Sequence, residues 1–180
     1  MWKKLRSKKG MTLTEMLATT MILLLVTVGM TTAVTLASRS FVRSLRESEA
    51  NELCSTLSVI LESEIGNANT VWLADPVSGS DDQKVTEFLG KDYQSATYHS
   101  SLMSDAEGRL IFANPLNTEQ KRELLSPSSY PHGLEAQVDK FTYNQTSQIY
   151  TIGLSIQYEG NEIVRRDFQI IAVNAPTIGS

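Results

Sequence analysis

Residues 10–37 read GMTLTEMLATTMILLLVTVGMTTAVTLA, and the last 22 of them, residues 16–37, contain no ionisable side chain. An α-helix rises about 1.5 Å per residue, so this run extends about 33 Å, which is enough to cross a hydrocarbon core of about 30 Å. We therefore expect a membrane-spanning helix in this stretch.

The residues before the run are basic. Residues 1–10 carry five Lys or Arg side chains and no acid, namely Lys3, Lys4, Arg6, Lys8 and Lys9. By the positive-inside bias this end stays in the cytoplasm, and the helix leads outward. Glu15 stands at the edge of the apolar run, where a carboxylate is costly unless it has a cationic partner.

This start resembles the class III leader of type IV prepilins and pseudopilins. That leader is short and basic, ends in Gly, and continues with Phe or Met, Thr-Leu, an apolar residue, Glu and an apolar run. The matching residues here are Gly10, Met11, Thr12, Leu13, Thr14 and Glu15. Thr14 departs from the aliphatic residue that is usual at its position. The close resemblance covers about the first 40 residues.

The resemblance implies a processing and assembly pathway. A membrane-embedded prepilin peptidase would cut after Gly10, where the absent side chain allows a close backbone approach, and would methylate the new amino terminus at Met11. In the family, the acid that corresponds to Glu15 neutralises the amine of a neighbouring subunit in the growing filament. The alternative from the residues alone is that Glu15 is merely interfacial and solvated.

The predicted fold class is α+β, with a long N-terminal helix packed against a C-terminal antiparallel sheet, as in type IV pilins. Four segments are expected: a removed leader (1–10), a transmembrane and filament-core helix (11–38), an amphipathic continuation of the helix (39–66) and a globular head (67–180). No proline occurs before Pro76, and Gly66-Asn67 supplies a plausible helix end.

Within the head, the clearest strand signals are the runs 134–143, 148–158 and 162–173, which short turns join into an antiparallel meander. The remaining elements of the head show shorter apolar patterns. They comprise a mostly irregular connection over 67–91 with a brief extended piece at 71–74, extended pieces at 93–102 and 109–113, a short helix at 119–125 and a loose tail at 174–180.

The sequence shows no catalytic constellation, cofactor motif or metal-ligand spacing, so we expect no enzyme activity, no cofactor and no metal. His99 and His132 are interpreted as lone surface histidines, and Cys54 as a small buried hydrophobe. A single cysteine excludes an internal disulfide. Asn144-Gln145-Thr146 fits a glycosylation acceptor, but a turn between strands explains the Asn already.

Charge also argues against a general nucleic-acid surface. Loss of the leader removes five of the 16 basic residues and none of the 20 acidic ones, which takes the formal net charge from −4 to −9. A chain this acidic is a poor ligand for phosphate backbones.

The function expected from these features is that of a minor pilin or pseudopilin, a structural subunit of a filament. Its expected partners are prepilin peptidase, other pilin subunits, an inner-membrane assembly platform and membrane lipid. Its expected location is a single-pass membrane protein with the head outside the cytoplasm, and then an extracellular filament. A membrane-anchored extracellular binding domain that never polymerises is the alternative, and a cell-surface enzyme is a third reading. A secretory signal peptide cut before Ser38 is disfavoured because its apolar region would be too long.

The first prediction is that processing removes ten residues and leaves an N-methylated Met11. The intact mass and N-terminal sequence of the membrane-extracted protein measure this directly. An N-terminus at Ser38, or an uncut chain in cells with active prepilin peptidase, contradicts it.

Overall fold

A computed structural model of the chain describes residues 12–74, 81–90 and 99–179. The predicted cleavage residues Gly10 and Met11 therefore lie outside the described part. The chain divides into two compact units, one ending at Leu45 and the other beginning at Arg46. The fold is α+β, as predicted.

Helix α1 spans Leu13–Gly66, 54 residues without a break, which confirms the single long helix and its end at Gly66. The part before Arg46 has no buried residue among those described. In the second unit the helix buries one stripe, made of Ala50, Leu53, Cys54, Leu57, Leu61 and Ile65. Opposite this stripe Val59 is 65% exposed, so the second part of α1 is amphipathic, as the sequence indicated.

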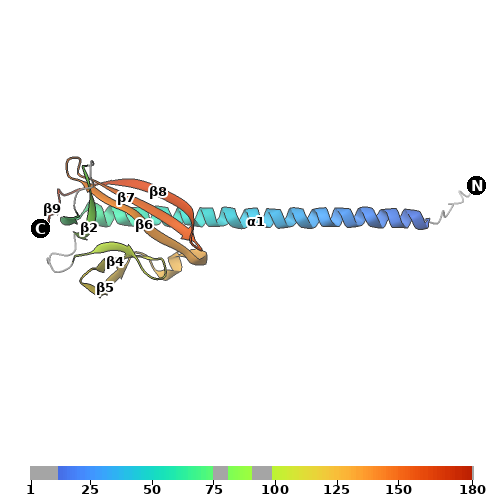
Figure 1. Cartoon of the computed structure of the whole chain (residues 1–180), viewed down its shortest axis with the longest axis horizontal. Helices are drawn as coiled ribbons and strands as arrows, with labels where there is room; N and C mark the ends of the chain where they lie inside the picture. Colours follow the sequence, from blue (N-terminus) through green and yellow to red (C-terminus); the bar gives the residue numbers. More distant parts are fainter. Residues whose placement is uncertain (1–11, 75–80, 91–98, 180) are drawn as a thin grey trace, which may run out of the picture. The chain divides into compact units, whose positions relative to one another are not determined.

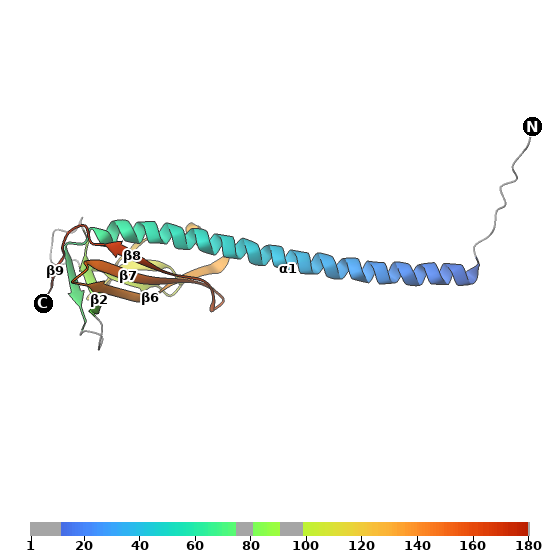
Figure 2. The same cartoon turned by 90° about the horizontal axis from the view of Figure 1, so that it is seen from above.

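An antiparallel meander packs on this stripe (Figures 1 and 2). It consists of β6 (Leu134–Asn144), β7 (Ile149–Tyr158) and β8 (Asn161–Ile171), and β7 pairs with both neighbours along its length. The three predicted runs are thus confirmed. The two-residue turn Glu159-Gly160 has φ of 50° and 74°, the left-handed pair that matches the twist of a tight hairpin.

Strand β7 supplies the centre of the core through side chains at alternate positions. Tyr150, Ile152, Leu154 and Ile156 are fully buried. The first two join a cluster with Leu61 and Ile65 of α1, and the last two join a cluster with Leu53 and Leu57. The alternate side chains of β7 therefore pack on the buried stripe of α1.

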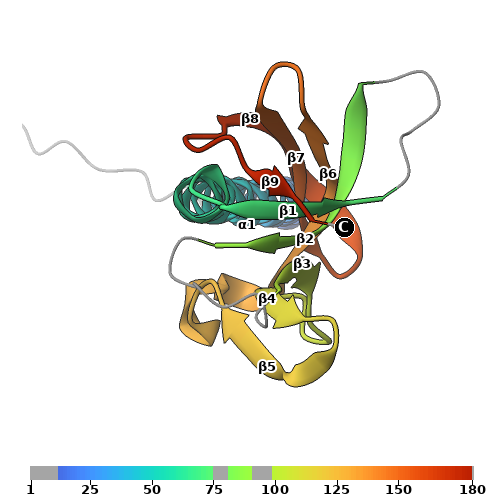
Figure 3. The same cartoon turned by 90° about the vertical axis from the view of Figure 1, so that its left-hand side faces the viewer.

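Strand β2 (Asp82–Leu89) joins the meander to the end of the head. Its first residues pair with β6, and Val85–Leu89 pair with β1 (Thr70–Leu73). The six-stranded order is β8-β7-β6-β2-β1-β9, and Figure 3 shows β1 crossing the end of α1. The extended piece at 71–74 is confirmed as β1. The expectation that the rest of the connection over 67–91 is irregular was wrong, because β2 occupies eight of its residues. Only Val85, Phe88 and Leu89 of β2 are buried, too few to give an alternating pattern.

A second, three-stranded sheet contains β3 (Ser101–Ser104), β4 (Leu110–Asn114) and β5 (Asn117–Glu123). β4 confirms the extended piece at 109–113, and β3 confirms the end of the piece at 93–102, whose residues 93–98 are outside the described part. The helix predicted at 119–125 is wrong, because β5 occupies most of it. Its helix-forming residues are overridden by pairing with β4, in which Arg122 lies opposite Phe112.

Two short 3₁₀ helices, η1 (Pro127–Ser129) and η2 (Pro131–Gly133), connect β5 to β6. The chain then ends in β9 (Thr177–Ile178), which pairs in parallel with β1. The Thr177 and Gly179 amides donate to the carbonyls of Asn69 and Val71, both at 2.9 Å. The loose tail predicted at 174–180 is therefore wrong for its described residues. At Gly179 any Cβ would overlap the Trp72 indole, so the close approach requires glycine.

The second prediction concerns the covered helix face. A soluble fragment of residues 39–180 should unfold cooperatively, and Leu57→Ala should lower its free energy of unfolding by about 3 kcal/mol through cavity formation. Val59→Ala, two positions away and 65% exposed, is the matched control and should change it by less than about 0.5 kcal/mol. Urea titration measures both values. Equal losses, or a fragment without a cooperative transition, would contradict the assignment of the core.

Candidate functional site

The first turn of α1 is closed by a reciprocal pair of hydrogen bonds. Thr12 precedes the helix, and its hydroxyl oxygen accepts the Glu15 N–H at 3.3 Å. A carboxylate oxygen of Glu15 accepts the Thr12 N–H at 3.4 Å. The Glu15 N–H is shared with the Thr12 carbonyl oxygen at 3.1 Å. The reciprocal side-chain pair is the capping-box arrangement, which is typical of a helix N-terminus.

Glu15 therefore has a local contact that the sequence interpretation missed. The signal was present, since Thr-x-x-Glu at residues 12–15 is the capping-box pattern. The carboxylate also lies at the N-terminal end of the helix dipole, where negative charge is favourable. An acid held in this way has a defined position at the start of the apolar run.

The surface that follows Glu15 is apolar and uncovered. From Leu13 to Leu45 the large apolar side chains are between 43% and 80% exposed. The helix is long and apolar enough to cross a membrane. So much contiguous apolar surface is costly in water, which favours contact with lipid or with another protein.

Threonines within the run do not bring unpaired polar groups into it. Six of their hydroxyls donate to backbone carbonyls three or four residues earlier, those of Thr19, Thr20, Thr27, Thr31, Thr32 and Thr35. A bonded hydroxyl costs far less in hydrocarbon than a free one. The threonines are consequently compatible with a lipid or helix-packing environment.

In the head, each histidine has an acidic partner. His99 Nδ1 lies 2.7 Å from Glu87 Oε2, and its ring stacks on Trp72 with centroids 3.7 Å apart. His132 Nδ1 lies 3.0 Å from Glu49 Oε2. The interpretation as lone surface histidines was therefore incomplete. Among the described residues no group of three or more His, Cys, Asp or Glu is placed to hold a metal ion.

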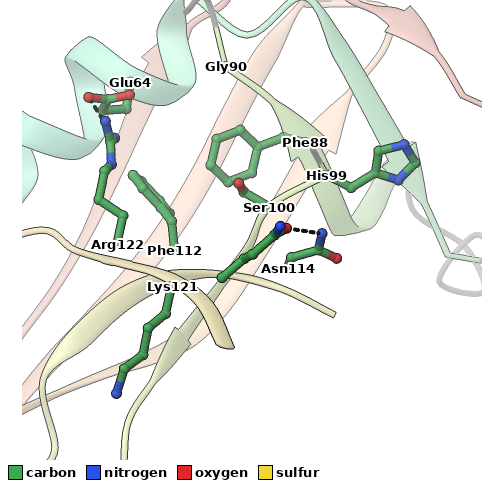
Figure 4. A pocket seen from close by; sticks show the side chains of 10 residues that line it. Glu64, Phe88, Gly90, His99, Ser100, Phe112, Asn114, Lys121 and Arg122 are labelled. Atoms are coloured by element: carbon green, nitrogen blue, oxygen red, sulfur yellow. Dashed lines mark hydrogen bonds and ion pairs between the residues drawn. The ribbon is translucent and has the colours of Figure 1, made fainter. Parts of the chain in front are cut away.

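A crevice of about 200 Å³ lies between β5, the end of α1 and β2 (Figure 4). Its floor is the edge-to-face pair Phe88 and Phe112, with ring centroids 5.1 Å apart. At its rim Arg122 pairs with Glu64 at 2.8 Å. This ion pair links β5 of the three-stranded sheet to α1.

Several polar groups in the described lining of this crevice are paired with other residues of the head. Ser100 supplies a hydroxyl group to the lining, and His99, the preceding residue, supplies an imidazole. The imidazole of His99, however, is engaged with Glu87 and Trp72. Asn114 and Gln120, also in the lining, hydrogen-bond to each other at 3.1 Å.

Two further sequence expectations are met. Cys54 is fully buried and forms no disulfide. Asn144 makes a turn in which its side-chain oxygen accepts the N–H groups of Thr146 and Ser147, while its Nδ2 donates to Asp82. The amide is thus fully engaged within the fold, as the turn interpretation of this residue predicted.

No protein-family model, no curated protein and no solved structure matches this chain.

The third prediction concerns Cys54. Burial raises the pKa of its thiol, and the positive charge of Arg166 offsets only part of that effect. Because thiolate is the reactive form, a disulfide reagent at pH 8 should modify the folded 39–180 fragment at least about 100-fold more slowly than the urea-unfolded fragment. Colorimetric thiol titration measures both rates, and equal rates would contradict burial of the thiol.

Proposed function

We propose that the chain is a minor pilin or pseudopilin, a structural subunit of a type IV pilus-like filament. The observation that carries the proposal is the uncovered apolar helix from Leu13 to Leu45, preceded by the Gly10-Met11 junction and begun by a fixed acid. A membrane covers such a surface before assembly, and neighbouring copies of the same helix cover it afterwards.

In this proposal prepilin peptidase cuts after Gly10 and methylates Met11. The basic leader leaves, while the apolar helix remains in the membrane with the head outside the cytoplasm. An inner-membrane assembly platform then extracts the subunit into an extracellular filament. No enzyme activity, cofactor or nucleic-acid site belongs to the proposal.

Glu15 acts in assembly by pairing with the Met11 amine of a neighbouring subunit. Cleavage creates this positive amine next to the start of α1, where the helix dipole disfavours positive charge. An unpaired charge in a low-dielectric filament core costs several kcal/mol, so a pair between neighbours favours the register that forms it. The capping box supports this role because it holds the carboxylate at the helix start.

The alternative is a membrane-anchored extracellular domain that never polymerises. It explains the apolar helix and the folded head equally well. It assigns no partner to Glu15 beyond Thr12, and it requires no cleavage at Gly10. The two functions therefore differ in what they predict for the charge of Glu15.

The fourth prediction uses Glu15→Gln, which removes the charge but keeps an oxygen that can accept the Thr12 N–H in the capping box. Cleavage should persist, while the amount of protein in sheared filaments should fall at least about tenfold, the effect of about 1.4 kcal/mol. The matched control is Glu62→Gln, an exposed acid in the second part of the same helix, which should assemble as wild type does.

Immunoblots of sheared and membrane fractions give both quantities. Equal amounts of wild-type and Glu15→Gln protein in the sheared fraction would contradict the assembly role of Glu15. Absence of wild-type protein from that fraction would favour the anchored domain.

A further inference from the structure

The crevice between β5, the end of α1 and β2 has two polar ends and an apolar floor. At one end Arg122 already binds a carboxylate, that of Glu64, at 2.8 Å. At the other end the amide side chains of Asn114 and Gln120 bond to each other. Figure 4 shows the two phenyl rings of the floor between Arg122 and Asn114. A carboxylate is therefore already bound at the arginine end, whereas the amide end binds none among the described residues.

The orientation of both amides is fixed by one backbone group. The Leu116 N–H donates to Asn114 at 2.9 Å, so the accepting atom is the amide oxygen and the other polar atom of Asn114 is its nitrogen. That nitrogen donates to the Gln120 oxygen at 3.1 Å. An amide nitrogen carries two hydrogens, so one on Asn114 and both on Gln120 have no acceptor among the described residues.

These free N–H groups favour an anionic acceptor over a neutral one. The Ser100 hydroxyl, which also lines the crevice and has no partner among the residues that the structure describes, adds a further donor. A carbonyl oxygen has two lone pairs, whereas a carboxylate offers about four acceptor sites. Hydrogen bonds to a charged acceptor are also roughly twice as strong as neutral ones. A carboxylate therefore matches this set of donors better than a carbonyl group does.

The floor and the volume of the crevice determine the rest of the ligand. Phe88 and Phe112 pack edge-to-face and are 2% and 4% exposed, so an aromatic or branched apolar group can lie against them. A volume of about 200 Å³ is below the range of about 300–1,000 Å³ that is usual for drug-sized ligands. The crevice therefore has space for one apolar group with a short chain.

We propose that this crevice binds a small free carboxylic acid, in which a short chain joins a single apolar group to the carboxylate. The carboxylate accepts hydrogen bonds from Asn114, Gln120 and Ser100, and the apolar group lies on the phenyl floor. Glu64 and Arg122 stay paired at the opposite end. The site lies in the head, and its binding does not depend on filament assembly.

The test uses the full-length chain in detergent micelles at neutral pH, with 3-phenylpropionate as the probe. Nitrogen–proton correlation NMR follows the side-chain NH₂ resonances of Asn114 and Gln120 during the titration. Both should shift saturably with a Kd of about 1 mM or below, a value within reach of so small a ligand. Acetate, which lacks the ring, and 3-phenylpropionamide, which lacks the charge, should each bind at least about tenfold more weakly.

The variant Gln120→Glu keeps the oxygen that accepts the Asn114 N–H and replaces the free nitrogen by a second carboxylate oxygen. It should weaken 3-phenylpropionate binding at least about tenfold and should instead bind 3-phenylpropylamine, because the free end becomes a negatively charged acceptor. The matched control is Gln137→Glu. Gln137 is an exposed residue of β6 outside the crevice, and its oxygen likewise accepts an amide N–H, that of Gln157, at 2.9 Å. The control should bind both probes as wild type does, and it accounts for uptake of the probes by the micelles.

Saturable shifts of the two amides, lost in Gln120→Glu and kept in Gln137→Glu, would support the site. The absence of a saturable shift in the wild-type chain would overturn the proposal and leave water as the occupant of the crevice. Equal affinity for 3-phenylpropionate and either its amide or acetate would overturn it as well, as would equal affinity of the two variants for the acid. Because the ligand series is measured on the wild-type chain, it tests the proposal even if a variant fails to fold.

Discussion

The structure depends on one constraint: a single continuous helix must have its side chains covered by two different environments. The backbone of α1 satisfies its own hydrogen bonds from Leu13 to Gly66, so the helix is equally regular in both environments. The side chains of its two parts, however, differ in burial. Before Arg46 no described residue is buried by the chain, whereas from Ala50 onward a stripe is fully covered. The head therefore needs to cover only one face of the second part.

Coverage of that stripe determines how the head is built. A meander of three long strands gives an apolar face, and β7, at its centre, contributes to both parts of the core. The stripe continues to Ile65, where β1 and β2 close the end of the core through Val71 and Phe88. With one cysteine and no disulfide, the head is stable through packing and strand pairing. The pairing of β9 with β1 secures the last described residues at this same end.

Elements whose pattern is local could be predicted from the sequence, and those fixed by distant partners could not. The length of α1 and the alternation in β7 each follow from a period that the chain itself displays. By contrast, β2 carries few apolar residues and owes its conformation to pairing with strands on both sides. Residues 119–123 are good helix formers, yet they pair with β4, and Arg122 reaches Glu64 on α1. Intrinsic helix propensity predicts conformation only weakly where a segment has tertiary partners.

The same distinction applies to the candidate site. Glu15 was predicted to be a functional residue from the sequence alone, because an acid beside an apolar run is unusual. Its contact with Thr12 depends on where the helix begins, and the position of a helix end is less certain than the existence of the helix. The acidic partners of His99 and His132 are 12 and 83 residues away, and no local pattern predicts contacts at such separations.

The capping box also explains how one acid can serve both the helix and an assembly. The first four N–H groups of a helix have no internal partner, and the hydrocarbon core of a membrane offers them no water. Thr12 and Glu15 supply side-chain acceptors to two N–H groups at this helix end. A carboxylate oxygen has more than one lone pair, so accepting the Thr12 N–H leaves capacity for an external cation. If cleavage occurs after Gly10, Thr12 becomes the second residue, and the cap and the new amine lie at the same helix end. In the proposed function, the residue that fixes the start of the helix also presents negative charge to a neighbour's amine, so one carboxylate at Glu15 would serve both roles.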